Sequence, residues 1–296
     1  MKNMKIEKAE KLGLCFGVRR AIKLLKEAAS KYGEIETLGP VAHNRLLVET
    51  LTNLGVKPIG HLDQARSKIL AITTHGTSPA VLSEIKARYI HIIDTTCPIV
   101  RKAQNAAKEL AEAGFDIIIF GDAEHSEVKG LLGWAGDKGM AALDIEQISS
   151  RVNPSSRLGI ISQTTQTQSA FIEFVRQLMG LVGPEIEEMR VVNTLCKVTQ
   201  GQQEAALELA RQSQLMIVIG GSNSANTRHL VEICSPLVET HSVEAADEVK
   251  SSWLAGKHHI GITAGASTPD EAVEELMDKL RSLKSLEQPR GRFRLD

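Results

Sequence analysis

Three cysteines recur in similar sequence contexts, and this recurrence is the first indication of chemistry. Cys15 lies in GLCFGV, Cys97 in DTTCPIV and Cys196 in NTLC. Each precedes a helix-like segment, and a short apolar, strand-like run follows each helix. A thiol at a strand-to-helix boundary is where an α/β protein places a reactive or metal-binding group. The fourth cysteine, Cys234, falls at helical spacing in HLVEICSPL, and we expect it to be a core residue.

Polar residues also recur at related positions in the three segments. One set follows the first apolar run at a common interval after each cysteine, and a second set follows a later run. The first set is His43, His125 and Ser224, and the second is His75, Thr164 and Ser267. These positions predict polar loops at equivalent strand ends.

The alternation of strand-like and helix-like segments predicts parallel βαβ units. We expect three small α/β repeats, at 1–96, 97–195 and 196–296, each containing one of the recurring cysteines. Ligands of such sheets bind beyond the carboxyl ends of the strands. The simplest arrangement is a trefoil of three parallel-sheet domains around a central, pseudo-threefold site.

Three converging thiolates favour a metal site over a single catalytic thiol. Structural zinc prefers four closed ligands, whereas a [4Fe–4S] cluster is usually held by thiolates. With three cysteine ligands, one iron has no protein ligand and is open to a substrate oxygen.

The polar loops and adjacent helix N-termini suit a phosphate or diphosphate. Neither a GxxxxGK[ST] loop nor a GxGxxG helix start is present, so nucleotide binding has no specific support. Glu127 is the one carboxylate that we place among these loops. Its alternative interpretation is a solvated glutamate at a helix start.

The composition narrows the class of partner. A net charge of -1 and 3% aromatic residues do not favour nucleic-acid binding. The N-terminus lacks the apolar region of a signal peptide, and FDIIIF is too short to cross a bilayer. We therefore expect a cytoplasmic protein without a membrane partner. The short basic tail PRGRFR is interpreted as solvated or packed over a domain edge.

These motifs together resemble those of the 4-hydroxy-3-methylbut-2-enyl diphosphate reductases, the final enzymes of the methylerythritol phosphate route to isoprenoids. The resemblance runs from Gly13 to about Pro269. It is carried by GLCFGVRRAI, GPVAHN, THGTSP, DTTCPIV, HSEVKG, SQTT, NTLC, NSAN and AGAST. It implies an α/β trefoil and an oxidoreductase that removes the allylic hydroxyl, giving isopentenyl and dimethylallyl diphosphates. It also implies an external electron donor such as ferredoxin or flavodoxin.

The resemblance also assigns roles to residues. Cys15, Cys97 and Cys196 would hold the [4Fe–4S] cluster. The implied diphosphate-binding residues are His43, His75, Ser224, Ala225, Asn226 and Ser267. His125, Glu127 and Thr164 would lie near the substrate hydroxyl and the proton path, with Glu127 as the proton donor.

Three positions depart from the common pattern of this family. Ala225 replaces a serine, Gln202 an arginine and Gln104 a histidine. These departures leave room for a paralogue with a related phosphorylated substrate. Two further alternatives are an aconitase-like iron–sulfur hydro-lyase, which needs no reductant, and a metal- or redox-sensing module.

Overall fold

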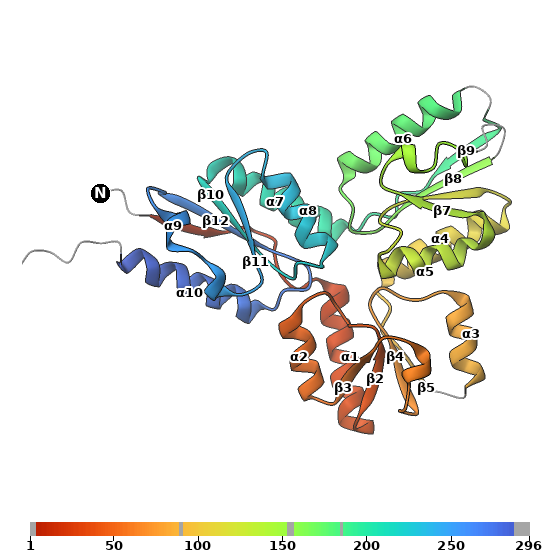
Figure 1. Cartoon of the computed structure of the whole chain (residues 1–296), viewed down its shortest axis with the longest axis horizontal. Coiled ribbons are helices and arrows are strands. Elements are labelled where there is room, and N and C mark those ends of the chain that lie inside the picture. The colour runs from red at the N-terminus through yellow and green to blue at the C-terminus, as the bar shows by residue number, and fades with distance from the viewer. Residues whose placement is uncertain (1–3, 89–90, 153–156, 184–185, 287–296) are drawn as a thin grey trace, which may run out of the picture. The chain divides into compact units, whose positions relative to one another are not determined.

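The computed structural model describes residues 4–88, 91–152, 157–183 and 186–286 (Figure 1). The tail PRGRFR lies outside these residues. Within them, the strands form three four-stranded sheets in which every pairing is parallel. The predicted α/β class with small parallel sheets is therefore confirmed.

The first two sheets have the same strand order. One has the order β3-β2-β4-β5 and the other β7-β6-β8-β9. The strands of the first are β2 (Ile35–Leu38), β3 (Val56–Ile59), β4 (Ile69–Ile72) and β5 (His91–Asp94). Those of the second are β6 (Asp116–Phe120), β7 (Gly139–Ala142), β8 (Arg157–Ser162) and β9 (Glu188–Val191).

The third sheet repeats this order only by including the N-terminal strand. Its order is β11-β10-β12-β1, with β1 (Lys5–Lys8), β10 (Leu215–Ile219), β11 (Thr240–Val243) and β12 (His259–Ala264). Residues 5–8, which we expected in the repeat at 1–96, therefore belong to the third sheet. The physical reason is that the strand before each cysteine completes the preceding repeat's sheet, and β1, before Cys15, completes the last one.

Helices lie between most successive strands, and a last helix follows the final strand. In the first repeat they are α1 (Phe16–Tyr32), α2 (Arg45–Asn53) and α3 (Pro79–Ala87). In the second they are α4 (Pro98–Glu112), α5 (Ser126–Ala135) and α6 (Gln168–Val182). In the third they are α7 (Lys197–Gln212), α8 (Ala225–Cys234), the short α9 (Ser251–Leu254) and α10 (Asp270–Leu286).

The sheet that contains β6 is covered by helices on both faces. Ile117 and Ile119 pack with α4 and α5, whereas Ile118 and Phe120 pack with α6. Because successive strand residues point to opposite faces, a sheet buried on both sides needs a continuous apolar run, here IIIF at 117–120. The same division recurs around β10, with α7 and α8 on one face and α10 on the other.

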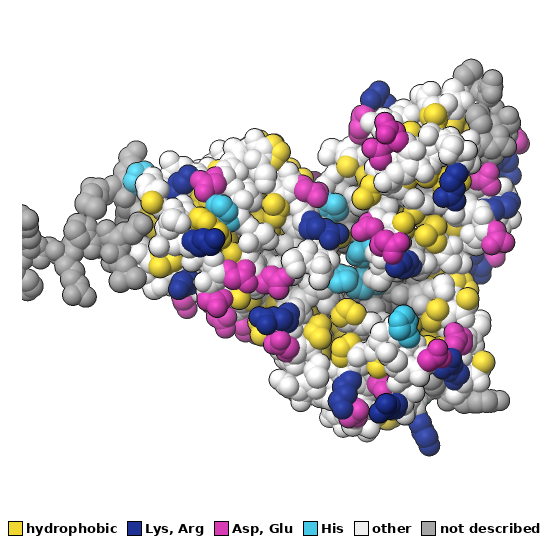
Figure 2. Space-filling view, viewed as in Figure 1, with side chains coloured by type: hydrophobic (Ala, Val, Ile, Leu, Met, Phe, Trp, Pro, Cys, Tyr) yellow, Lys and Arg dark blue, Asp and Glu magenta, His cyan; other side chains and the backbone are white. Residues whose placement is uncertain are grey.

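The chain divides into two compact units. The described parts of 1–14, 43–45 and 201–296 form one, and those of 15–42 and 46–200 form the other. Side chains of both charge signs are mixed over the visible face, in keeping with the small net charge (Figure 2). Among the helices that the structure describes, none has both the length and the apolar character needed to cross a membrane.

Candidate functional site

All three recurring cysteines lie at helix starts in the larger unit. Cys15 and Cys97 are the N-cap residues of α1 and α4, and Cys196 directly precedes α7. Pro98 occupies the first turn of α4, where its missing N–H costs no intrahelical hydrogen bond. Each thiol is thus next to backbone N–H groups that have no intrahelical acceptor.

The loops that carry Cys97 and Cys196 are tied to their neighbouring strands by matching hydrogen bonds. The N–H of Cys97 donates to the Thr74 carbonyl at 3.0 Å, and the N–H of Cys196 donates to the Thr164 carbonyl at 2.8 Å. Two residues before each cysteine, the hydroxyls of Thr95 and Thr194 donate to the last carbonyls of β4 and β8. These bonds make Thr74, rather than His75, the counterpart of Thr164.

The thiols lie close enough to influence one another electrostatically. Burial raises the pKa of Cys15, and nearby Cys97 and Cys196 raise it further. A Cβ atom at Gly17 would lie 2.7 Å from the Sγ of Cys97 and 3.9 Å from the Sγ of Cys15. Gly17 therefore leaves open the space beside these two sulfurs.

This arrangement fits a group held by three thiolates. The backbone N–H groups of Gly17 and Val18 lie beside Cys15, and those of Ile99 and Val100 lie beside Cys97, and they lower the pKa of each thiol against the effect of burial. Hydrogen bonds to sulfur are among the features that tune iron–sulfur sites. The donor set and the space at Gly17 therefore suit such a group.

Cys234 does not belong to this group of cysteines. It is fully buried in α8 among core residues, and burial raises the pKa of its thiol to about 11. The prediction of a core cysteine is confirmed.

Glu127 is buried beside the cysteines, so the interpretation as a solvated helix-start glutamate is wrong. Its two carboxyl oxygens accept from the Thr164 N–H at 2.6 Å and the Thr164 hydroxyl at 2.9 Å. Burial raises the pKa of Glu127 to about 7, although the bonds from Thr164 lower it. The negative charge of Glu127 contributes to the raised pKa of Cys97, which places the two groups near each other.

His125 begins the helix that carries Glu127. Its Nδ1 accepts from the Glu127 N–H at 3.2 Å, capping α5. In the neutral imidazole the proton then lies on Nε2, which becomes a hydrogen-bond donor. The ring of His75 meets that of His125 edge-on, with the centroids 5.4 Å apart.

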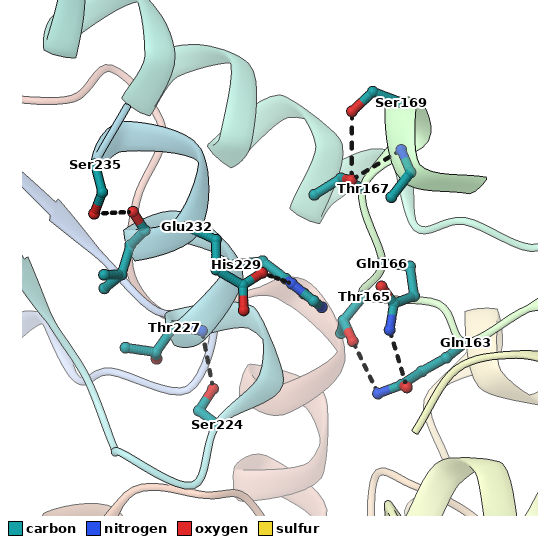
Figure 3. A network of polar contacts seen from close by, with 12 residues as sticks. Gln163, Thr165, Gln166, Thr167, Ser169, Ser224, Thr227, His229, Glu232 and Ser235 are labelled. Carbon is teal, nitrogen blue, oxygen red and sulfur yellow. Dashed lines mark hydrogen bonds and ion pairs between the residues drawn. The ribbon is translucent and has the colours of Figure 1, made fainter. Parts of the chain in front are cut away.

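The smaller unit contains the loops that follow β10 and β12. Ser224 is the N-cap of α8 and accepts from the Thr227 N–H at 3.3 Å (Figure 3). Ala225, the first residue of α8, keeps an N–H that has no intrahelical acceptor. In the described chain, both polar atoms of the buried Asn226 side chain and the hydroxyl of buried Ser267 lack hydrogen-bond partners. These buried polar atoms therefore have hydrogen-bonding capacity available for a polar ligand or water.

His43 also belongs to the smaller unit. A Cβ atom at Gly221 would lie 2.1 Å from the His43 carbonyl oxygen, so a glycine is required for this approach. Burial lowers the pKa of His43, and the positive charge of Arg228 lowers it further. Both effects favour the uncharged form of the His43 imidazole.

The predicted site residues thus divide between the two units. The larger unit brings together Cys15, Cys97, Cys196, His75, His125, Glu127 and Thr164, whereas the smaller contains His43, Ser224, Ala225, Asn226 and Ser267. Sequence reasoning missed the pairing of Glu127 with Thr164. It also missed the loop contacts of Thr95 and Thr194, although the threonine two residues before both Cys97 and Cys196 was a usable signal.

All three departures from the family pattern are buried, and two of them are glutamines with hydrogen-bond partners. Gln202 donates from Nε2 to the Gly13 carbonyl at 2.8 Å. Gln104 is fully buried, accepts a hydrogen bond from Arg101 and donates one to the Thr77 carbonyl. Both glutamines have hydrogen-bonded structural positions.

The fold and site define an α/β protein that places three free cysteines and a buried carboxyl at helix starts. The LytB protein family model matches residues 6–281, and the chain belongs to this family. A relative from Dehalococcoides mccartyi (strain CBDB1), named 4-hydroxy-3-methylbut-2-enyl diphosphate reductase, is 44% identical over 95% of this chain and 99% of its own length. A relative of the same name from Geobacter sulfurreducens is 38% identical over 94% of this chain and 97% of its own length.

Solved structures agree with these relatives. One, described as (E)-4-hydroxy-3-methyl-but-2-enyl diphosphate reductase, the terminal enzyme of the non-mevalonate pathway, is 35% identical with a TM-score of 0.69. It covers 94% of this chain and 99% of its own. The E-1-hydroxy-2-methyl-but-2-enyl-4-diphosphate reductase from Plasmodium falciparum is 25% identical, with a TM-score of 0.88. The match covers 93% of this chain and 87% of that protein's chain.

Proposed function

We propose that this chain catalyses the reductive dehydroxylation of 4-hydroxy-3-methylbut-2-enyl diphosphate to isopentenyl and dimethylallyl diphosphates. The family membership and the names of the relatives support an oxidoreductase of isoprenoid biosynthesis. The observation that carries the mechanism is the buried Glu127 carboxyl, with a pKa of about 7, beside three mutually close thiols.

Proteins of this family are iron–sulfur enzymes, and we propose a [4Fe–4S] cluster held by Cys15, Cys97 and Cys196. When bound, such a cluster supplies electrons and a Lewis-acidic iron. The helix-start N–H groups beside Cys15 and Cys97 support this assignment, because they stabilise negative charge on sulfur. In our proposal the three repeats surround this group about a pseudo-threefold axis.

Glu127 is proposed to act as the proton donor. The reaction consumes two electrons and two protons, because the C–O bond breaks, the hydroxyl leaves as water and a C–H bond forms. A carboxyl with a pKa near the working pH holds a proton and can release it. Thr164 fixes both oxygens of Glu127, and the Nε2–H of His125 supplies a further donor near the hydroxyl.

The diphosphate is assigned to His43, His75, Ser224, Asn226, Ser267 and the backbone N–H of Ala225. The partnerless polar atoms of Asn226 and Ser267 support this role, as does the positive end of α8. Ala225 lacks the hydroxyl of the usual serine but keeps its N–H. Anchoring the diphosphate would position the carbon chain for proton transfer.

The electrons are proposed to come from an external carrier such as ferredoxin or flavodoxin. Four free cysteines suit a reducing compartment, and we propose the cytoplasm. No carrier is needed for an aconitase-like hydro-lyase, so turnover that is independent of reductant would favour that alternative.

The test is anaerobic purification followed by iron and sulfide analysis. We expect about four irons and four sulfides per chain. Replacing Cys15, Cys97 or Cys196 by serine should sharply reduce cluster content and reductant-dependent turnover, whereas Cys234→Ser should leave the cluster content unchanged. Stoichiometric zinc in place of iron would overturn the assignment.

A further inference from the structure

The carbonyl oxygen of Thr77 is held by two side chains from neighbouring helices. The Nε1–H of Trp134, near the end of α5, donates to it at 3.0 Å. The Nε2–H of Gln104, on α4, donates to it at 3.4 Å. Thr77 lies two residues after His75 in the loop THGTSP. The position of that loop therefore depends on α4 and α5.

Helix α5 approaches this loop through glycines. A Cβ atom at Gly133 would lie 2.3 Å from the Cβ of Ser78, and one at Gly130 would lie 3.7 Å from the Cα of Thr77. The backbone of α5 thus rests on residues 77 and 78. The same helix begins at His125, whose ring meets that of His75. One helix therefore contacts the loop near both of its ends.

Gln104 is fully buried beneath the loop and is itself held in place. Its Oε1 accepts from Arg101 at 2.9 Å, and Arg101 forms an ion pair with Asp94 at the end of β5. A Cβ atom at Gly76 would lie 2.3 Å from the Nε2 of Gln104, and Gly76 has a φ of 70°. No L side chain fits this position without strain. The glutamine amide therefore packs directly against the backbone next to His75.

We propose that Trp134 and Gln104 are positioning residues that hold His75 against His125 for diphosphate binding. Gln104 stands where the family commonly has a histidine, so its amide supplies a hydrogen bond here without a titratable ring. This inference rests on the proposed function of His75. It assigns a role in substrate affinity to two side chains that do not themselves bind the diphosphate.

The test is a double-mutant cycle between Trp134 and His75 in the cluster-loaded enzyme. Trp134→Phe keeps the aromatic ring but removes the N–H donor, and loss of one hydrogen bond corresponds to about a fivefold change in an equilibrium. We expect KM for the substrate to rise about fivefold, with kcat changed much less. In a His75→Ala background, Trp134→Phe should have no further effect on KM, because it acts through His75.

Trp253→Phe is the matched control. Trp253 is the other tryptophan in the sequence, is also half-buried, and stacks on His241 with the centroids 4.0 Å apart. This control should leave KM unchanged. In the Trp253→Phe protein only Trp134 emits indole fluorescence, and added inorganic diphosphate should change that emission. Adding His75→Ala should abolish the change.

The outcomes separate the two proposals. If His75→Ala leaves KM unchanged, the diphosphate role of His75 is wrong. If His75→Ala raises KM but Trp134→Phe does not, or if the two effects on KM multiply, the positioning role is wrong. Should Trp134→Phe fold poorly, Gln104→Leu removes the other donor to Thr77, and the same cycle with His75 decides.

Discussion

Thr164 holds both oxygens of the Glu127 carboxyl, one through its backbone N–H and the other through its hydroxyl. The Thr164 carbonyl at the same time accepts from the N–H of Cys196. A single residue thus connects the proposed proton donor to the loop of a proposed cluster ligand. This connection explains how a buried carboxyl is kept in one orientation beside the cysteines, and the first two predictions follow from it.

Glu127→Gln should lower turnover with a chemical reductant at least about a hundredfold, the order of a general-acid contribution. Glutamine keeps the shape of the side chain but cannot give up a proton in the same way. Iron content should stay unchanged, because Glu127 is not a proposed ligand. Glu124→Gln is the control, since Glu124 is exposed and pairs with Lys129. Near-normal turnover of the cluster-loaded Glu127→Gln enzyme would show that another group, such as the diphosphate, donates the proton.

The stability of the metal-free protein should depend on pH through Glu127. Its pKa is raised from 4.5 to about 7, so the folded state keeps a proton that the unfolded chain loses. This stabilisation is fully present below the pKa of the unfolded chain, 4.5, and is lost as the pH rises through the pKa of the folded state, about 7. Relative to that of Glu127→Gln, the wild-type free energy of unfolding should fall by about 3 kcal/mol as the pH rises from 4.5 to about 7.

Urea denaturation of both metal-free proteins at the two ends of that interval, under reducing conditions, measures this difference. Comparing the two proteins removes the contribution of other titrating groups. Parallel dependence on pH in the two proteins would show that Glu127 has an ordinary pKa.

Gly17→Ala should reduce cluster content without unfolding the chain. The added methyl would lie 2.7 Å from the Sγ of Cys97, within the space beside the thiols. Gly180→Ala is the control, because a Cβ atom there meets nothing within 4 Å in the described structure and lies within helix α6. That substitution should stabilise the protein slightly, since glycine is a poor helix residue. Full iron occupancy in Gly17→Ala would contradict a cluster at this position.

Ser224→Ala and Asn226→Ala should each weaken substrate binding, and inorganic diphosphate should compete with the substrate. Each change removes a buried polar group assigned to the anion, at a cost of about tenfold in affinity. Asn223→Ala serves as the control, since Asn223 lies in the same loop but is exposed. Calorimetric titration with diphosphate measures the affinities. Unchanged affinity in both Ser224→Ala and Asn226→Ala would place the anion elsewhere.

Much of this protein follows from its sequence alone. The recurrence of Cys15, Cys97 and Cys196, each before a helix and an apolar strand, predicted the parallel α/β repeats without any coordinates. This succeeds because the part of a strand that is covered on both faces is a continuous apolar run, as in IIIF at 117–120, and such runs can be recognised in a sequence. The core position of Cys234 followed from helical spacing in the same way.

The tertiary structure decided what depends on contacts between distant segments. The segment Lys5–Lys8 is too short and too polar to be predicted as a strand. Its pairing with β12 follows from the topology, in which the strand before Cys15 completes the sheet of the last repeat. The counterpart of Thr164 is Thr74 rather than His75, because backbone hydrogen bonds rather than residue type define equivalent positions. Likewise, the pKa of Glu127 comes from burial and from Thr164, 37 residues further along the chain. The local sequence determines the propensity of a segment to form a helix or a strand. The burial of a side chain and its hydrogen-bond partners are decided only when distant segments pack together.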